Sequence, residues 1–269
     1  MAGKLKGGAG WAVVTGASSG LGAIFADQLA QRGMPLVLAG RDRARLEQVQ
    51  HRVREAHDVD VELVVGDLGT PAGVDDLISA LGGRAIGVLV NNAGFGTYGK
   101  LAEIDAERDH ELVAVNVDAL VRLNHAVLPG MLDRGRGGIL NVASTIAFQP
   151  APYQATYGAS KAFVLSYSHS LAGELAGTGV SATVLCPGPV ETGFNAAAGF
   201  TDEEAHDALP SFLWVSAADV ARAAVVGMDR GRTVVVPGMG NRAGTVLARL
   251  APRRLLVPIL ARNHPALRN

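Results

Sequence analysis

A tyrosine and a lysine stand four residues apart in Tyr157-Gly158-Ala159-Ser160-Lys161, near the start of a predicted helix. Side chains at this spacing share a helix face and lie about 5–6 Å apart at Cβ. An ammonium group at that range lowers the pKa of a phenol from about 10 to about 8. A phenol tuned in this way can exchange a proton near neutral pH. The pair therefore predicts acid–base chemistry on a substrate oxygen.

The composition of the chain makes this pair informative. The chain has four tyrosines and four lysines, against twenty arginines. Chance then supplies about 0.06 such pairs per chain. Because arginine is the usual cation here, a lysine at this position indicates that a compact point charge is needed. The alternative is a surface lysine whose stem covers a packed tyrosine.

A second candidate site is a glycine-rich turn between the first predicted strand and the first predicted helix. Gly16, Gly20 and Gly22 follow the strand at 12–15. A helix N-terminus with bare backbone around it is a binding site for a pyrophosphate. Ser18 and Ser19 are expected to add hydroxyl contacts or to cap the helix. Because the chain has 34 glycines, their spacing alone is weak evidence for a nucleotide-binding turn. The strand–turn–helix context, however, favours a dinucleotide site over an ordinary turn.

The residues after the second predicted strand bear on the choice of dinucleotide. Arg41 comes first, followed by Asp42 and Arg43. An arginine at this point favours the 2′-phosphate of NADP, whereas a carboxylate accepts hydrogen bonds from the ribose hydroxyls of NAD. The order predicts NADP(H) as the preferred cofactor. NAD(H) stays open because of Asp42, and Arg41 as a solvated charge at the start of a helix is a further alternative.

The elements that must position these residues alternate along the chain. Short, nearly continuous apolar runs alternate with helical periodicity, which predicts a parallel sheet covered on both faces. Strands are expected at 12–15, 35–39, 61–65, 88–90, 138–142, 180–185 and 233–236. Helices are expected at 20–32, 41–56, 71–81, 105–132 with breaks, 156–175 and 217–228. The predicted fold is α/β: one domain over residues 1–269, with a doubly wound, Rossmann-type parallel sheet of about seven strands flanked by helices.

Composition narrows the classes of function. The net charge of −1 argues against a protein built to bind nucleic acid. The single cysteine, Cys186, excludes an internal disulfide, and the seven histidines form no metal-binding motif, so no metal site is expected. The apolar stretch at 11–14 is too short for a signal-peptide core, and no uninterrupted apolar run reaches 18 residues. A cytoplasmic location is therefore predicted.

Taken together, these motifs resemble the short-chain dehydrogenase/reductase family, in the subgroup with a Thr-Gly-x-x-x-Gly-x-Gly turn. The resemblance runs from about residue 11 to 237. Further matching segments are Asp67-Leu68, Asn91-Asn92-Ala93-Gly94, Asn116, Ser144 (thirteen residues before Tyr157) and Pro187-Gly188-Pro189-Val190-Glu191-Thr192. Without the other motifs, Ser144 would be interpreted as a strand-end cap and Asn116 as a packed polar residue.

The resemblance implies roles for these residues. Tyr157 would be the general acid or base, and Ser144 would donate a hydrogen bond to the substrate oxygen. Lys161 would lower the pKa of Tyr157 and hold the nicotinamide ribose, and Asn116 would interrupt its helix to hold a water that relays protons. The implied catalytic set is Asn116, Ser144, Tyr157 and Lys161. The implied cofactor contacts are Gly16, Ser18, Ser19, Gly20, Leu21, Gly22, Arg41, Asp67, Leu68, Asn92, Ala93, Gly94, Tyr157, Lys161, Pro187, Gly188, Val190 and Thr192. A homodimer or homotetramer is also implied.

Aromatic residues gather in the segments expected around the substrate. A lid is expected at about 190–215, with Phe194, Phe200, Phe212, Leu213 and Trp214. Phe95, Tyr98, Phe148 and Tyr153 follow motif positions and are expected to line the same cleft. Ligand pockets are mostly apolar, so these residues predict a hydrophobic carbonyl substrate such as a 3-oxoacyl thioester, a steroid-like ketone or an aryl ketone. The alternative is that they pack a subunit interface or a rigid lid.

The C-terminal part of the chain is strongly basic. Residues 230–269 contain eight arginines and no acidic residue, whereas the preceding part has 16 basic and 25 acidic residues. An amphipathic stretch is expected at 243–262, interrupted by Pro252 and Pro258, inside a basic segment at about 242–269. Three interpretations stay open: contact with anionic lipid, contact with an acidic acyl-carrier protein or acyl thioester, and packing on the domain near a subunit interface.

The sequence thus predicts an NADP(H)-dependent oxidoreductase that interconverts a hydrophobic ketone and a secondary alcohol. The alternatives are an NAD-dependent alcohol dehydrogenase that uses the same groups, and a non-catalytic dinucleotide-binding sensor or scaffold. The complete set of Asn116, Ser144, Tyr157 and Lys161 argues against the sensor, because a sensor needs only the glycine turn.

Overall fold

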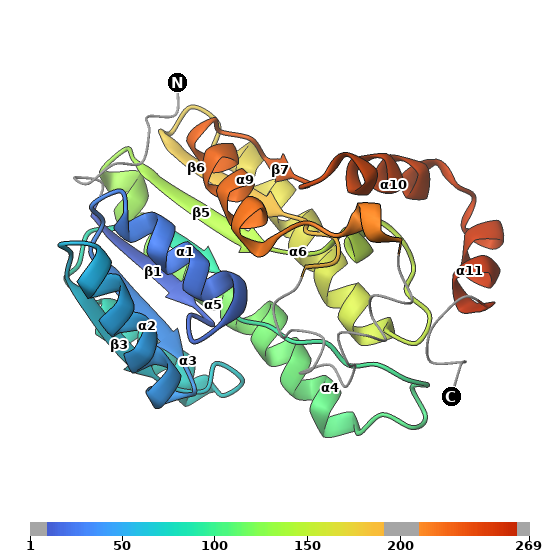
Figure 1. Ribbon diagram of the computed structural model, residues 1–269, viewed down its shortest axis with the longest axis horizontal. Coiled ribbons are helices and arrows are strands. Elements are labelled where there is room, and N and C mark those ends of the chain that lie inside the picture. Colours follow the sequence, from blue (N-terminus) through green and yellow to red (C-terminus); the bar gives the residue numbers. More distant parts are fainter. Residues whose placement is uncertain (1–9, 191–209, 263–269) are drawn as a thin grey trace.

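A parallel sheet of seven strands forms the centre of the molecule (Figure 1). The computed structural model describes residues 10–190 and 210–262. The strand order is β3-β2-β1-β4-β5-β6-β7, and each neighbouring pair is parallel. The strands are β1 (Trp11–Thr15), β2 (Leu36–Gly40), β3 (Val61–Val65), β4 (Ile86–Asn91), β5 (Gly137–Val142), β6 (Val180–Leu185) and β7 (Val234–Val235).

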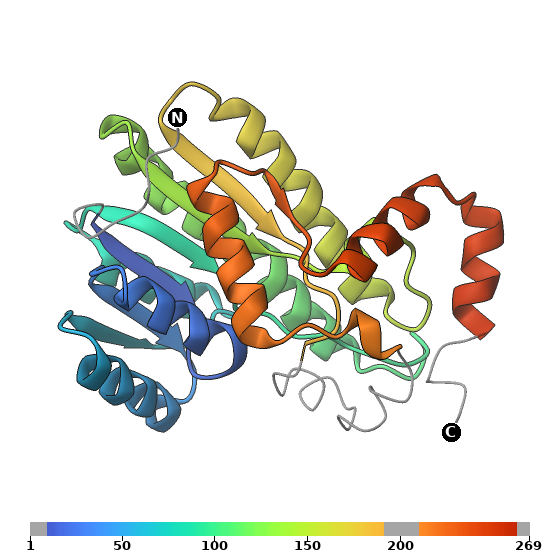
Figure 2. The same ribbon diagram turned by 45° about the horizontal axis from the view of Figure 1, so that its top comes forward.

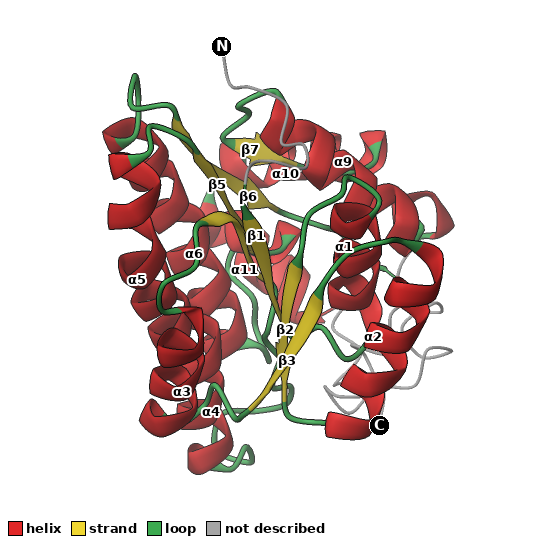
Figure 3. Ribbon diagram, turned by 90° about the vertical axis from the view of Figure 1, so that its left-hand side faces the viewer, coloured by secondary structure: helices red, strands yellow, loops and turns green. Residues whose placement is uncertain are grey.

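Helices cover both faces of this sheet. Figure 3 views the sheet edge-on, with α3, α5 and α6 on one side and α1, α2 and α9 on the other. The α-helices are α1 (Gly20–Ala30), α2 (Arg43–Ala56), α3 (Pro71–Leu81), α4 (Ala106–Val113), α5 (Ala119–Asp133), α6 (Ala155–Glu174), α9 (Ala217–Asp229), α10 (Met239–Leu250) and α11 (Arg253–Arg262). Shorter turns are the π-helical η1 (Ala114–Asp118) and the 3₁₀-helical η2 (Thr145–Phe148) and η3 (Ser211–Leu213).

The strand order places a topological switch point between β1 and β4. From β1 the chain builds the sheet outward through β2 and β3, and it then returns to the other side of β1 with β4. The helices that follow β1 and β2 (α1 and α2) therefore lie on one face, and the helices between β4 and β6 (α5 and α6) lie on the other. A crevice opens beyond the carboxyl ends of the strands at such a point. The polar motifs that follow β1, β2, β4, β5 and β6 are brought to this edge.

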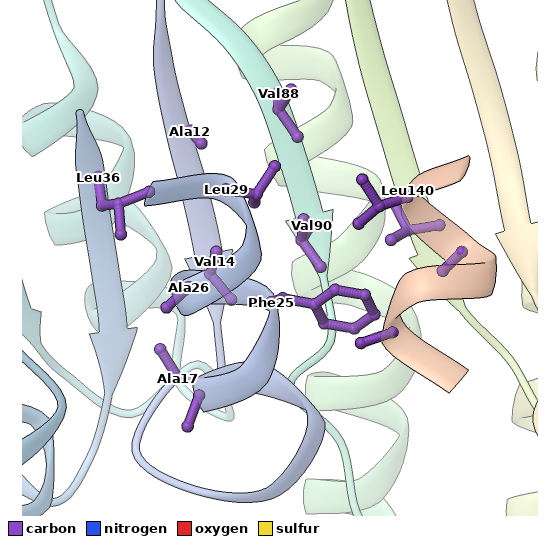
Figure 4. Packing of buried hydrophobic residues seen from close by; sticks show 14 of the residues in the cluster. Ala12, Val14, Ala17, Phe25, Ala26, Leu29, Leu36, Val88, Val90 and Leu140 are labelled. Atoms are coloured by element: carbon purple, nitrogen blue, oxygen red, sulfur yellow. The ribbon is translucent and has the colours of Figure 1, made fainter. Parts of the chain in front are cut away.

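Two apolar cores hold the layers together. On one face, Phe25 and Leu29 of α1 lie against Val14, Val90 and neighbouring strand residues (Figure 4). On the other face, a cluster that includes Leu123 and Met131 of α5 packs against the sheet. Fully burying a side chain such as Phe25 stabilises the fold by about 1.5–3 kcal/mol. Because both sheet faces are covered, the strands are apolar along nearly their whole length.

The predicted fold class is confirmed, with differences at element boundaries. The strand at 61–65, the helix at 71–81 and the strand at 180–185 have the predicted limits. The helix predicted at 41–56 begins only at Arg43, because Asp42 caps it by accepting a hydrogen bond from the Arg45 amide. The long helix predicted at 105–132 is divided by the π-helical turn η1, which contains Asn116.

Two stretches, Ala106–Asp133 and Ser211–Asp229, are long and apolar enough to cross a membrane by length and composition alone. In this fold part of each stretch is buried in the domain. Leu123 and Met131 belong to the core cluster under α5, and Val220 and Val225 belong to the core cluster under α9. Burial against the sheet thus explains the apolar residues on the inner side of each helix.

The last two helices lie beyond the sheet. Figures 1 and 2 show α10 and α11 at the side toward which the carboxyl ends of the strands point, with α11 standing away from the sheet. The amphipathic stretch predicted at 243–262 is helical but starts earlier, at Met239. Pro252 separates the two helices as expected, whereas Pro258 lies inside α11 and does not interrupt it.

Candidate active site

A cleft of about 1010 Å³ runs along the carboxyl ends of the strands. Its walls come from the turns after β1, β2, β4, β5 and β6 and from α10 and α11. Most of the predicted site residues line it: Gly16, Ser18, Ser19, Gly20, Leu21, Arg41, Asp67, Leu68, Asn92, Ala93, Gly94, Ser144, Tyr157, Lys161, Pro187, Gly188 and Val190. Gly22 and Asn116 lie behind this lining, and Thr192 falls outside the described residues.

The glycine turn is fixed against the turn after β4. Gly16 has a φ of +63°, and a Cβ at this position would lie 2.9 Å from the Cα of Ala93. Glycine is therefore required for both the backbone angle and the close approach. The Thr15 hydroxyl accepts hydrogen bonds from the Asn92 amide at 3.0 Å and from the Ala93 amide at 2.9 Å. The Asn92 side chain donates to the Thr15 carbonyl at 2.9 Å. These hydrogen bonds hold the turns after β1 and β4 together, and the two turns form the floor of the cleft.

Helix α1 begins at this floor without a side-chain cap. Ser19 occupies the N-cap position, but its hydroxyl makes no capping hydrogen bond. The predicted capping role of Ser19 is therefore wrong. By contrast, α2 and α3 are capped by the side chains of Asp42 and Thr70. The first-turn amides of α1 thus have no side-chain acceptor and lie at the cleft, which fits the pyrophosphate of a dinucleotide.

Charged side chains gather at the end of the cleft beside β2. Arg41 is the first residue after the strand, and its side chain is 63% exposed. Its Nη1 lies 3.9 Å from Oδ2 of Asp67. Asp42 is occupied as the cap of α2, and Arg45 Nε lies 3.3 Å from its Oδ2. Arg45, which the sequence did not single out, lines the cleft together with Arg41.

Tyr157, Ser144 and Lys161 meet at the other end of the cleft. Ser144 lies two residues after the end of β5 and caps η2, and its hydroxyl is hydrogen-bonded to that of Tyr157. The Tyr157 ring packs with Phe95 and Leu112. Lys161, one helical turn later on α6, is buried, and its Nζ lies 5.7 Å from the Tyr157 ring centroid. The same Nζ donates to the Val142 carbonyl at 2.9 Å. The spacing in the sequence thus brings the phenol and the ammonium together as predicted.

The expected effect of this pair on acidity is wrong for the protein chain alone. Burial raises the pKa of Tyr157 to about 12, and the hydrogen bond from Ser144 opposes that rise. Burial also lowers the pKa of Lys161 to about 8. Desolvation disfavours the charged form of each group and is the largest cause of both pKa shifts. A lower pKa of Tyr157 would need a further positive charge in the cleft, and an oxidised nicotinamide carries one.

The buried lysine makes the stability of the protein pH-dependent. Its pKa is about 8 in the folded protein, against 10.5 for an exposed lysine, so between these values the unfolded chain binds more protons. The stability that this group contributes is present above about pH 10.5 and is lost as the pH falls through 8. Tyr157 acts in the opposite direction from pH 10 upward, because its pKa is raised from 10.0 to about 12.

We therefore expect wild-type protein to gain stability between about pH 7.5 and 9.5 relative to Lys161→Met, by about 2 kcal/mol. Urea unfolding of both proteins without dinucleotide, followed by circular dichroism, measures this difference. Other titrating groups are common to both proteins and cancel. Parallel stability curves for the two proteins would contradict a desolvated, titrating Lys161.

Asn116 is buried behind the cleft and acts on its wall. Its side-chain amide donates to the Phe95 carbonyl at 3.0 Å and to the Ser160 hydroxyl at 3.1 Å, and its Oδ1 accepts from the Phe95 amide at 3.2 Å. Ser160 in turn donates to the Tyr157 carbonyl at 2.7 Å. The predicted interruption of the helix at Asn116 is confirmed by the π-helical turn. Asn116 thus ties the segment after β4 to the helix that carries Tyr157.

A buried carboxylate, which the sequence did not indicate, makes a second tie. Asp109 of α4 accepts a hydrogen bond from the Thr97 hydroxyl at 2.6 Å and from the Thr156 hydroxyl at 2.5 Å. Thr156 precedes Tyr157 in the chain. The bridge therefore fixes the loop after Gly94 to the first turn of α6, beside the phenol.

The outer part of the cleft differs from the aromatic lining that was predicted. Phe95, Leu213 and Trp214 line it as expected. Tyr153 instead lines a separate cavity of about 250 Å³, and the Phe148 ring lies under Arg249 at 4.5 Å. Phe212 is exposed, and neither it nor Tyr98 lines the cleft. Phe194 and Phe200, with most of the expected lid, fall outside the described residues.

Helices α10 and α11 supply lining residues that no motif indicated. These are Asn241, Gly244, Thr245, Ala248 and Leu260. Asn241 is buried, donates to the Leu213 and Pro237 carbonyls at 2.9 and 3.1 Å, and contacts Gly188 closely. It therefore links α10 to the turn after β6. No pattern in the sequence after β7 distinguishes Asn241, because Arg242 follows it directly and Thr245 lies close by.

Comparison with known proteins identifies the family. The family model for short chain dehydrogenases matches residues 10–203. The very-long-chain 3-oxoacyl-CoA reductase of Anas platyrhynchos is 37% identical over 188 residues, which cover 68% of this chain and 60% of that protein. The hydroxysteroid dehydrogenase-like protein 1 of Gallus gallus is 34% identical over 80% of this chain and 64% of its own length. These matches span about three fifths of the length of these two relatives.

Solved structures agree with this assignment over almost the whole chain. A short-chain dehydrogenase from Sphingobium yanoikuyae in complex with NADPH is 34% identical, with a TM-score of 0.80, over 92% of this chain and 94% of that one. A bulky-bulky ketone specific alcohol dehydrogenase from Comamonas testosteroni is 30% identical, with a TM-score of 0.75, over 94% and 92%. A relative from Burkholderia phymatum, 28% identical with a TM-score of 0.78 over 95% and 96% of the two chains, was solved in complex with NAD. A nicotinamide dinucleotide is thus the cofactor class, and the chain belongs to the short-chain dehydrogenase/reductase family of oxidoreductases.

Proposed function

We propose that the protein is an NADP(H)-dependent reductase that converts a hydrophobic ketone or 3-oxoacyl-type carbonyl into a secondary alcohol, or the reverse. The proposal rests on one arrangement: Tyr157, Ser144 and Lys161 meet at one end of a cleft whose other end carries Arg41 and Arg45. A dinucleotide lying along this cleft would have its two ends beside these two groups of residues.

The floor of the cleft holds the dinucleotide in this proposal. The free amides at the start of α1 bind the pyrophosphate, and Arg41 and Arg45 bind the 2′-phosphate. Asp67 and Leu68 contact the adenine side, and Lys161 holds the nicotinamide ribose. The turns with Asn92, Ala93 and Gly94 and with Pro187, Gly188 and Val190 close the remaining walls. When bound, the reduced nicotinamide supplies the hydride that adds to the carbonyl carbon.

The catalytic residues handle the proton and the charge on the substrate oxygen. Tyr157 donates its phenolic proton to the carbonyl oxygen as the C–O double bond becomes single, and it takes a proton back in alcohol oxidation. Ser144 donates a hydrogen bond to the same oxygen and stabilises its developing charge. Its existing hydrogen bond to Tyr157 aligns the two hydroxyls. Asn116 positions this end of the cleft through Phe95 and Ser160.

A hydrophobic substrate is supported by the outer lining of the cleft. Phe95, Ile146, Trp214, Ala248 and Leu260 provide apolar walls beyond the three catalytic side chains. Apolar walls with a few convergent polar groups are typical of sites for bulky, apolar ligands. Two relatives point the same way by name, one as a very-long-chain 3-oxoacyl-CoA reductase and one as a bulky-ketone alcohol dehydrogenase. A cytoplasmic location and a homodimer or homotetramer stay predictions.

A panel of ketones, followed by loss of NADPH absorbance, tests the proposal. We expect turnover of long-chain 3-oxoacyl thioesters, polycyclic ketones or aryl ketones, at least about tenfold faster in kcat/KM than of small polar carbonyls such as dihydroxyacetone, because apolar contacts strengthen binding. Tyr157→Phe protein in parallel controls for background oxidation of NADPH. Activity confined to small polar carbonyls would reject the substrate class. Equal use of NADH would reject the cofactor preference but not the reaction.

A further inference from the structure

The outer face of α10 is an apolar stripe that no described part of the chain covers. Met239, Val246, Leu247 and Leu250 are 86%, 55%, 68% and 77% exposed. Together with Ala243, they follow a spacing of three and four residues, which places them on one side of the helix. Asn241 and Thr245 are buried on the opposite side, against the cleft. The helix therefore buries the face that carries Asn241 and Thr245, and it presents its apolar face to solvent.

Helix α11 follows α10 after Pro252 and carries further exposed apolar side chains and charge. Leu255 and Ile259 are also largely exposed, at 59% and 56%. Arg253, Arg254 and Arg262 are exposed on the same helix, and Arg242 and Arg249 are exposed on α10. Neither helix contains an acidic residue. Large exposed apolar patches mark surfaces that bind a partner or a membrane, and here the two helices that form the patch carry positive charge alone.

This combination decides between possible occupants. In a symmetric pair of copies the same patch would face itself, so the arginines of one chain would approach those of the other. No acidic side chain on either helix would offset their repulsion. An anionic bilayer instead suits both features of the surface: its headgroups can bind the arginines, and the boundary with its acyl chains can bury the apolar stripe. Figures 1 and 2 show α11 standing clear of the sheet, where a flat surface can reach it.

We propose that α10 and α11 form a peripheral membrane-docking surface that binds anionic phospholipid bilayers. The apolar stripe of α10, with Leu255 and Ile259, enters the headgroup region, and Arg253, Arg254 and Arg262 contact lipid phosphates. This inference does not depend on the proposed reaction, because it uses only residues outside the catalytic set.

Flotation of the full-length protein with lipid vesicles tests this surface. We expect it to float with phosphatidylcholine vesicles that contain about 30% phosphatidylglycerol, and to stay unbound with phosphatidylcholine alone, because anionic lipid supplies the surface potential. Raising sodium chloride from about 0.1 M to about 0.5 M should release most of the protein through screening. Failure of the wild-type protein to float with anionic vesicles would overturn the proposal.

Matched variants separate the two contributions. Arg253→Gln/Arg254→Gln should lower the partition coefficient about 20- to 30-fold, because each arginine near an anionic surface contributes a roughly fivefold gain. Arg52→Gln/Arg136→Gln removes the same charge from exposed positions on other parts of the domain and should change binding less than about threefold. Leu250→Ser should lower binding about tenfold, whereas Leu132→Ser, a 40% exposed leucine at the end of α5, should not.

Further measurements exclude the other occupants. Unchanged circular dichroism of each variant shows that the fold is intact. Light scattering tests whether a second copy of the chain covers the stripe. If Leu250→Ser converts an oligomer into a smaller species and wild-type protein does not bind anionic vesicles, a second copy covers the stripe and the proposal is wrong. Saturable binding to an acidic acyl-carrier protein without vesicle binding would overturn it in favour of that partner.

Discussion

Replacing Tyr157 by phenylalanine is expected to lower kcat for carbonyl reduction by about 10²- to 10⁴-fold, which is the usual contribution of a positioned general acid. The ring itself should stay in place. It packs with Phe95 and Leu112, and it lies beside Gly96, where an added Cβ would be 3.5 Å from the ring. The change therefore removes the hydroxyl with little disturbance of the cleft. Steady-state kinetics with a bulky ketone and NADPH measure the loss.

Dinucleotide affinity separates a chemical effect from a structural one. The Tyr157→Phe protein should bind NADPH within about twofold of wild type in a fluorescence titration, since the main cofactor contacts lie at the α1 end and around Arg41. Tyr167→Phe is the matched control. It makes the same chemical change on the same helix, at a ring stacked on Phe163 at 5.8 Å and outside the cleft lining. An active Tyr157→Phe enzyme would remove Tyr157 from the catalytic set.

The pH dependence of the two reaction directions should also reflect the role of Tyr157 as acid and base. Because burial raises the pKa of Tyr157 to about 12 without dinucleotide, the phenol is fully protonated at neutral pH and ready to act as an acid. Alcohol oxidation needs the ionised phenol, so its rate should rise with pH more steeply than that of ketone reduction. This asymmetry follows from burial and not from the lysine, which is itself desolvated.

The sequence predicted the sheet because both of its faces are covered. Strands such as Val61–Val65 and Val180–Leu185 are mostly apolar segments between helical stretches, and their limits could be predicted within a residue. The catalytic motifs could be found for a related reason. Parallel strands bring their carboxyl ends to one edge, so residues directly after β1, β4, β5 and β6 must meet there.

What the sequence did not predict depends on packing between distant segments. Asn241 and Leu260 reach the cleft because α10 and α11 fold back over the strand ends, and no local pattern encodes that direction. The pKa of Tyr157 depends on burial beside Phe95 and Leu112, which a spacing of four residues cannot reveal. Asp42 illustrates the same limit on a smaller scale. Its role as a helix cap became clear only from the start of α2 at Arg43.

Replacing Arg41 by alanine is expected to raise KM for NADPH about 10- to 100-fold and to change KM for NADH less than about threefold. Hydrogen bonds between charged groups contribute about 1.5–3 kcal/mol, and the 2′-phosphate offers such a partner only in NADP. Arg41 is free to turn toward the cleft because its one ionic neighbour among the described residues, Asp67, is 3.9 Å away. Asp42 cannot readily replace it as a ribose acceptor, since it is bonded to the Arg45 amide. Kinetics with both dinucleotides at fixed ketone measure the selectivity.

Neighbouring arginines provide the controls for this effect. Arg43→Ala removes the same charge two residues away, but that guanidinium faces Glu47 at 3.8 Å and does not line the cleft, so selectivity should not change. Arg45→Ala should lower NADPH preference in the same direction as Arg41→Ala, and the double variant should lose more than either, because both guanidinium groups line one end of the cleft. An equal rise in KM for NADPH and NADH in Arg41→Ala would show that this arginine stabilises the start of α2 but does not bind the 2′-phosphate. The cofactor preference would then have to come from another residue at the adenosine end, such as Arg45.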